Sequence, residues 1–85
     1  MSLCSIVELT EIMRETLGDD DSVDLDRDIL GIPLIDLGFD SLAKLELAAN
    51  LRHRFGVVVP DDVIETLDTP ADTLAWVNTQ LVAVA

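Results

Sequence analysis

Apolar residues recur every three or four positions in three stretches of this chain, and this pattern favours packed helices over any other architecture. The stretches carry Ile6, Leu9, Met13 and Leu17, then Leu45, Ala48, Leu51 and Phe55, and finally Leu74, Val77, Leu81 and Val84. A chain of 85 residues is long enough for one small core. We therefore expect a single all-α domain over residues 1–85.

Capping signals delimit the first and last of these helices. Ser5, followed three residues later by Glu8, has the form of a capping box. Gly18 can end this helix in the left-handed conformation. Thr69 followed by Pro70 is a strong start for the last helix, because proline suits the first helical position.

The second helix should begin at Asp40 or Ser41, since either side chain can cap it, and should end at Gly56. Three valines at 57–59 have strand character, but the sequence offers no second strand to pair with them. We expect an extended connection there, followed by a short helix within residues 60–67. The predicted fold is a four-helix bundle with three longer helices and a short third one.

A connection of some twenty residues separates the first two helices. Residues 19–28 are dense in aspartate, spaced like the opening of a calcium-binding loop. That reading fails because Ile29 and Ile35 occupy the positions that need glycine and glutamate, so we expect a solvated acidic loop and no metal site. The rest should be held against the core by Ile29, Leu30, Leu34, Leu37 and Phe39.

The net charge of the chain limits the classes of molecule that it can bind. Seventeen acidic residues against five Lys and Arg give a net charge of −12. Such a chain is repelled by nucleic acid and by anionic membranes, and is steered towards basic patches on proteins. The single cysteine, Cys4, excludes an internal disulfide. With no signal peptide or membrane-spanning run in the sequence, we expect a cytoplasmic monomer.

Ser41 stands where the second helix begins, and it could be a nucleophile, a cap or an attachment point. A nucleophile needs a nearby base, but His53, the only histidine, lies twelve residues along the same helix, about 18 Å away. Asp40 can act as the cap by itself, and the positive end of a helix favours an attached phosphodiester. The residues alone leave cap and attachment open.

The stretch LGFDSL, residues 37–42, resembles the phosphopantetheine-attachment motif of acyl carrier proteins. The resemblance extends over nearly the whole chain, through DSLAKLE, FGVVVPDDV and DTPADTLAWVN. The segments LAANLRHRFGVVVPDD and LDTP look most like the stand-alone carriers of type II polyketide synthases. Fatty-acid carriers usually have a more acidic second helix, from which Lys44, Arg52, His53 and Arg54 depart.

This resemblance implies a shuttle and not an enzyme. Ser41 would bear a covalent 4′-phosphopantetheine arm from coenzyme A, and the arm would carry malonyl units and the growing polyketide as thioesters. The implied partners are a phosphopantetheinyl transferase, a malonyl transferase, a ketosynthase/chain-length factor, and a ketoreductase, aromatase or cyclase.

The resemblance also assigns roles around Ser41. Asp40 and Leu42 would be read by partners, although a core role for Leu42 is as plausible. Glu46 matches the partner-docking acid of the family, and Asp61 and Asp62 could meet basic patches on the synthase.

A groove between the second helix, the third helix and the long connection could shelter the reactive chain. Its candidate walls are Leu45, Ala49, Val63 and Ile64, although the sequence favours an ordinary core role for each of them. Two alternatives stand beside the type II polyketide assignment. One is a carrier of fatty-acid or another thioester pathway, and the other is an unmodified acidic helical module that only binds proteins.

Overall fold

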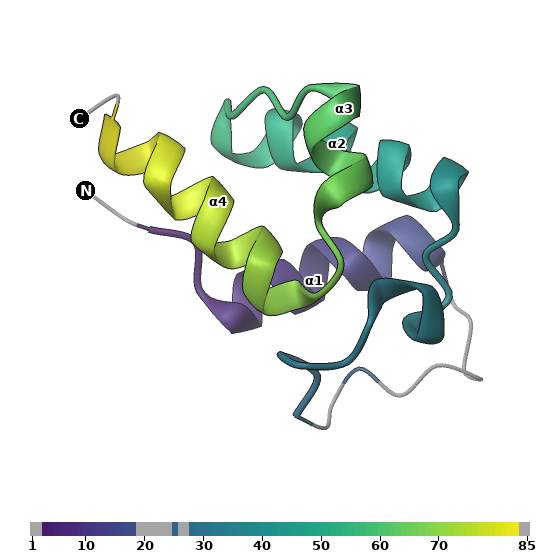
Figure 1. Cartoon of the computed structure of the whole chain (residues 1–85). Helices are drawn as coiled ribbons and strands as arrows, with labels where there is room; N and C mark the ends of the chain where they lie inside the picture. The colour runs from purple at the N-terminus through teal and green to yellow at the C-terminus, as the bar shows by residue number, and fades with distance from the viewer. Residues whose placement is uncertain (1–2, 19–24, 26–27, 84–85) are drawn as a thin grey trace.

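Helices form all the regular structure in the part of the chain that the structure, a computed structural model, describes: residues 3–18, 25 and 28–83. The elements are α1 (Ile6–Leu17), η1 (Leu34–Leu37), α2 (Ser41–Phe55), α3 (Asp61–Thr66) and α4 (Pro70–Ala83). Helix α1 packs against α2 and α4, and α2 packs against α3 (Figure 1). The predicted all-α bundle with a short third helix is confirmed, and none of the described helices is long and apolar enough to cross a membrane.

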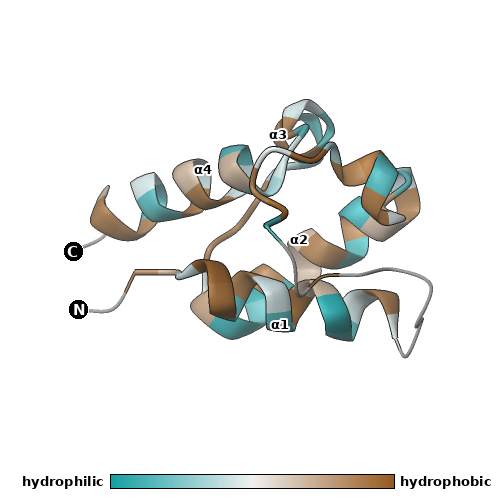
Figure 2. Ribbon diagram, turned by 90° about the horizontal axis from the view of Figure 1, so that it is seen from below, coloured by the Kyte–Doolittle hydropathy of each residue, from teal (hydrophilic) through white to brown (hydrophobic). Residues whose placement is uncertain are grey.

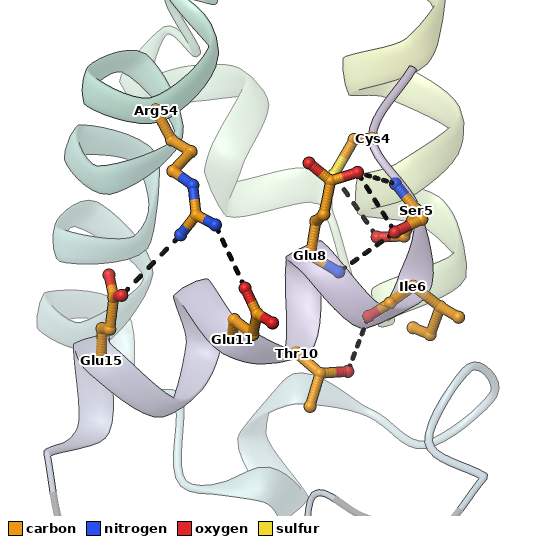
Figure 3. Close-up of polar contacts among 8 residues, drawn as sticks. All are labelled: Cys4, Ser5, Ile6, Glu8, Thr10, Glu11, Glu15 and Arg54. Atoms are coloured by element: carbon orange, nitrogen blue, oxygen red, sulfur yellow. Dashed lines mark hydrogen bonds and ion pairs between the residues drawn. The ribbon is translucent and has the colours of Figure 1, made fainter. Parts of the chain in front are cut away.

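The predicted capping box starts α1 (Figure 3). The amide of Glu8 donates to Ser5 Oγ at 3.1 Å, and the amide of Ser5 donates to the Glu8 carboxylate at 3.4 Å. The predicted end of this helix is only half right. Gly18 has a positive φ of 73°, which suits glycine, but its ψ of −152° lies outside the left-handed helical region.

The core draws large side chains from every element. Its fully buried members are Leu9, Ile12, Met13, Ile29, Leu34, Leu37, Phe39, Leu47, Leu51, Ile64 and Val77. Figure 2 shows apolar and polar residues alternating around the helices, as expected when each helix buries one side. On α2 the buried side runs through Leu47 and Leu51. The prediction that Leu45 belongs to that side is wrong, because Leu45 lies about 160° around the helix from Leu47 and is 40% exposed.

The connection between α1 and α2 has more structure than its sequence indicated. A 3₁₀ turn, η1, forms within it, and its Leu34 amide donates to the carbonyl of Asp68 at 2.7 Å. The Leu30 carbonyl accepts from the amide of Ala71 at 3.0 Å. Four of the five predicted anchors are buried. Leu30 is the exception at 39% exposed, since its backbone, and not its side chain, makes the attachment. The expected acidic loop lies largely outside the described residues.

Polar contacts join α1 to α2 along their solvent-facing edge. The guanidinium of Arg54 lies 3.1 Å from Glu11 and 3.7 Å from Glu15 (Figure 3). The side-chain amide of Asn50 donates to the hydroxyl of Thr16 at 2.8 Å. Arg54, one of the three Lys and Arg residues of α2, therefore pairs with acids of α1.

The segment before α1 lies beside α4 (Figure 1) and is fixed there by Asn78. Its side chain accepts from the Cys4 amide at 2.7 Å and donates to the Cys4 carbonyl at 3.0 Å. This pairing buries the thiol of Cys4. Burial raises the pKa of that thiol from 9.0 to about 11, and the nearby charge of Glu8 adds to the rise.

We expect the Cys4 thiol of the folded protein to react far more slowly with a thiol reagent at pH 8 than the same thiol in guanidinium chloride. Thiolate is the reacting species, and the fold both shields the sulfur and disfavours its ionisation. The unfolded thiol ionises near pH 9 while the folded one does not, so the free energy of unfolding should fall as the pH rises from 9 to 11. Absorbance of a disulfide reagent measures the rates, and equal rates in both states would contradict the buried position.

Candidate functional site

Asp40, and not Ser41, caps α2. The Asp40 carboxylate accepts from the amide of Ala43 at 2.8 Å, and its backbone is extended, with φ −76° and ψ −173°. Ser41 is the first residue of the helix, it is exposed, and its hydroxyl makes no hydrogen bond to any residue that the structure describes. The sequence left open whether Asp40 or Ser41 caps α2, and the structure shows that Asp40 does.

The chain just before Ser41 is firmly anchored. Phe39 is completely buried, and its amide donates to the Leu34 carbonyl at 2.9 Å. Gly38 is left-handed, with φ 93° and ψ 8°, a conformation that favours glycine. The left-handed turn ends η1 and lets the next residue enter the core. As a result the start of α2 is fixed on the core, while Ser41 itself faces solvent.

The free amides at the start of α2 make this position favourable for an anion, because the first turn of a helix carries partial positive charge. No acidic side chain lies in the first turn after Asp40. An exposed hydroxyl that has no partner among the described residues, beside such a helix end, fits an attached phosphodiester such as that of phosphopantetheine. The neighbouring charge of Asp40 opposes such a group, but its carboxylate is engaged with the amide of Ala43.

A hydrolytic site around Ser41 is not supported. Helix α2 is continuous from Ser41 to Phe55, so His53 lies about 18 Å along its axis from Ser41. His53 is also exposed. Within the described ranges no group of three or more His, Cys, Asp or Glu side chains could hold a metal ion.

The five residues predicted for partner recognition are all exposed. Leu42 is 65% exposed, so the core role considered for it is excluded. Asp40 and Glu46 lie on the first half of α2 and its cap. Asp61 and Asp62 form the first turn of α3, which packs against α2.

The predicted groove residues divide into two groups. Ile64 is completely buried, so it is a core residue. Val63 is only half-buried. Leu45 and Ala49 are exposed on α2. The four residues belong to two helices that pack together, and a shelter for an acyl chain between them stays a prediction.

Ile35 is an exposed apolar residue of the connection that precedes α2. The sequence did not indicate its exposure. It is 64% exposed on η1, between the buried Leu34 and Leu37. A 3₁₀ helix has three residues per turn, so residues 34 and 37 share one side and residue 35 is turned away. Recognising η1 in the sequence would have revealed this exposure.

Comparison with known proteins also indicates a phosphopantetheine attachment site. Residues 7–77 match the family model described as the phosphopantetheine attachment site. The tetracenomycin polyketide synthase acyl carrier protein of Streptomyces glaucescens is 46% identical over 80 residues, covering 94% of this chain and 93% of that protein. The actinorhodin polyketide synthase acyl carrier protein of Streptomyces coelicolor is 39% identical, covering 99% of this chain and 98% of its own. The solution structure of the 3-oxo-butyl form of the actinorhodin carrier, an intermediate mimic, has a TM-score of 0.90 to this chain, with 39% identity and coverage of 99% and 98%.

Proposed function

The chain belongs to the phosphopantetheine-attachment family, among the acyl carrier proteins of type II polyketide synthases, and we propose that Ser41 is its attachment point. The Ser41 hydroxyl would carry a 4′-phosphopantetheine arm taken from coenzyme A. When bound, this arm supplies a thiol that holds acyl groups as thioesters. The chain is thus a carrier and not an enzyme, and its cargo would be malonyl units and the growing polyketide.

One observation carries the choice of Ser41: the carboxylate of Asp40 caps the helix and leaves the neighbouring hydroxyl exposed, with no hydrogen-bond partner in the part of the chain that the structure describes. A serine that served as the cap would have its oxygen occupied by a backbone amide. Here the first turn keeps its positive end, and the buried Phe39 fixes the direction in which Ser41 projects. The chain's own part in the chemistry is to present one oxygen atom on a rigid support.

The partners follow from this cargo. Attachment requires a phosphopantetheinyl transferase, and loading requires a malonyl transferase. Elongation requires a ketosynthase/chain-length factor, and a ketoreductase, aromatase or cyclase would act on the product. Asp40, Leu42 and Glu46 on α2, with Asp61 and Asp62 on α3, support docking by their exposure and charge. We place these encounters in the cytoplasm.

Sheltering of the acyl chain would take place between α2 and α3. Val63 and Ile64 would form its inner wall, and Leu45 and Ala49 would form its rim. Ile64 is fully buried in this structure, so α3 would have to shift to admit a chain.

The test is a two-step loading experiment. The protein is treated with coenzyme A, magnesium and a promiscuous phosphopantetheinyl transferase, and then with malonyl-CoA and a malonyl transferase. We expect one fast-reacting thiol after the first step, because Cys4 is buried, and its loss after the second step. Hydroxylamine should cleave the thioester and restore that thiol. Failure to gain a fast thiol would refute the carrier role and leave the protein-binding module as the explanation.

A further inference from the structure

A shallow hollow lies between the end of α3 and α4, the helix that follows α3 in the chain (Figure 1). Its lining residues are Thr66, Leu67, Asp72, Ala75, Trp76 and Thr79. The four that belong to α4 are three or four positions apart, so they share one side of that helix. None of the six belongs to α2 or to the residues proposed above for docking of the synthase enzymes. The hollow is therefore a separate feature of the surface.

Trp76 forms the aromatic wall of the hollow. Its ring is half-buried, because one part packs against the core while another part lines the hollow. The neighbouring Ala75 is exposed and has only a methyl group, so it leaves room beside the ring. Leu67, just after α3, adds apolar surface. A flat group can therefore lie against the indole.

The hydroxyl groups of the hollow can only accept further hydrogen bonds. Thr66 Oγ1 donates its proton to the carbonyl of Val63 at 2.7 Å. Thr79 Oγ1 donates its proton to the carbonyl of Ala75 at 2.8 Å. A hydroxyl has one proton and two lone pairs, so both hydroxyls present only lone pairs to a ligand. The carboxylate of Asp72 is likewise an acceptor.

The charge of Asp72 is not neutralised from within the described part of the chain. Its carboxylate forms no ion pair or hydrogen bond with any described residue, and no Lys, Arg or His follows Arg54 in the sequence. Asp72 lies in the first turn of α4, where an acid offsets the positive end of a helix. That role explains the acid by itself, but it does not require an aromatic ring and two accepting hydroxyls beside it.

These groups together select one class of ligand. An anion would be repelled by Asp72, and a wholly apolar group would remove its carboxylate from water without replacing the lost hydrogen bonds. A metal ion lacks ligands, since no group of three or more His, Cys, Asp or Glu side chains in the described ranges could hold one. A flat cation rich in N–H donors meets all the requirements, because guanidinium stacks on aromatic rings and pairs with carboxylates.

We propose that this hollow is a binding site for a guanidinium group, supplied by an arginine side chain on the surface of another protein. The guanidinium plane would lie against Trp76 and donate to the carboxylate of Asp72 and to the two threonine hydroxyls. Lysine would fit less well, because its ammonium group is a point charge with no plane to stack. The inference goes beyond the proposed carrier function and does not depend on Ser41 or its arm.

The fluorescence of Trp76 provides the test, since Trp76 is the one tryptophan of the chain. The full chain is titrated, at constant ionic strength, with the capped tripeptide Gly-Arg-Gly. We expect a saturating change in fluorescence. The same peptide with lysine should bind about 3-fold more weakly, and the peptide with citrulline, which is neutral and nearly the same shape, should give no saturating change.

Two variants locate the binding in the hollow. Ala75→Met fills the space beside the ring and should weaken binding of the arginine peptide at least about 10-fold. Its matched control is Ala83→Met, the same substitution at an exposed position of α4 outside the hollow. Asp72→Asn should weaken binding about 3-fold. Asp36→Asn removes one charge from an exposed site on η1 and should leave binding unchanged. Thermal melting checks the fold of each variant.

Equal binding of the arginine and citrulline peptides would overturn the proposal, as would unchanged binding by Ala75→Met. An equal loss in Asp36→Asn and Asp72→Asn would also overturn it, because attraction by overall charge would then suffice. Sedimentation of the chain alone covers the other source of arginine. If the chain self-associates and Ala75→Met abolishes this, the arginine comes from a second copy and its assignment to another protein is wrong. Failure to accept phosphopantetheine would count against the carrier function alone.

Discussion

Replacing Ser41 with alanine should abolish phosphopantetheine addition completely while leaving the fold intact. The hydroxyl is the proposed acceptor of the arm, and in its absence no thioester can form. Because Asp40 caps α2, Ser41→Ala should change the free energy of unfolding by no more than about 0.5 kcal/mol. Asp40→Ala should lower it by about 1 kcal/mol. Denaturant unfolding measures the stabilities, and intact mass after transferase treatment measures the addition.

Ser5→Ala is the matched control for this prediction, since Ser5 also stands at a helix start but serves as its cap. That variant should lose about 1 kcal/mol of stability and still accept the arm. If Ser41→Ala gained the arm at the rate of the unaltered protein, the assigned attachment point would be wrong. If it lost as much stability as Asp40→Ala, the conclusion that Asp40 and not Ser41 caps α2 would be wrong.

The second large effect is expected for Phe39→Ala, which should lower the free energy of unfolding by about 3–5 kcal/mol. Phe39 is completely buried between η1 and α2, and its removal leaves a cavity where the long connection is anchored. A loss of this size is a large part of the total stability of a small domain. The variant should also accept the arm more slowly, because the buried ring of Phe39 helps to fix the start of α2 on the core.

Ile35→Ala is the companion to Phe39→Ala. Ile35 belongs to the same connection but is mostly exposed, so its loss should change stability by less than about 0.5 kcal/mol. Urea unfolding of both variants, with the unaltered protein, measures the difference. A loss below about 1 kcal/mol for Phe39→Ala would show that the connection is not anchored through this ring.

Much of this fold could be predicted from local signals. The capping box at Ser5, the cap at Asp40, the turn at Gly56 and the proline at 70 each act within a few residues, and the structure has all four. The short third helix was also predicted, and it forms at Asp61–Thr66. The three valines at 57–59 form no strand, as predicted from the lack of a second strand in the sequence. For Ser41, helix length alone excluded the nucleophile, and the resemblance of residues 37–42 to the attachment motif of acyl carrier proteins indicated the attachment role.

What could not be predicted depends on contacts between distant parts of the chain. The turn η1 is held by the carbonyl of Asp68, more than thirty residues away in sequence. The exposure of Leu45 and Ile35 follows from which side of α2 and of η1 meets the core. Spacing alone offered several apolar sides for α2, and packing against α1 and α3 selected the one with Leu47 and Leu51.

The pairing of Arg54 with Glu11 and Glu15 is a further example of such a contact, because it joins residues of α1 and α2 that the sequence keeps far apart. In the sequence, Arg52 and Arg54 belong to one basic run. In the structure, Arg54 pairs with two acids of α1, whereas Arg52 forms no ion pair with any residue that the structure describes. The chemistry of the two residues is the same, and their positions around the helix give them different surroundings.

The most direct test of the attachment point is a peptide map of the unaltered protein after treatment with coenzyme A, magnesium and a phosphopantetheinyl transferase. The intact mass should rise by one phosphopantetheine group, and fragmentation should place that group on Ser41 and not on Ser2, Ser5 or Ser22. An unchanged mass of the folded protein, or a group placed on any other residue, would contradict the assignment of Ser41 as the carrier serine.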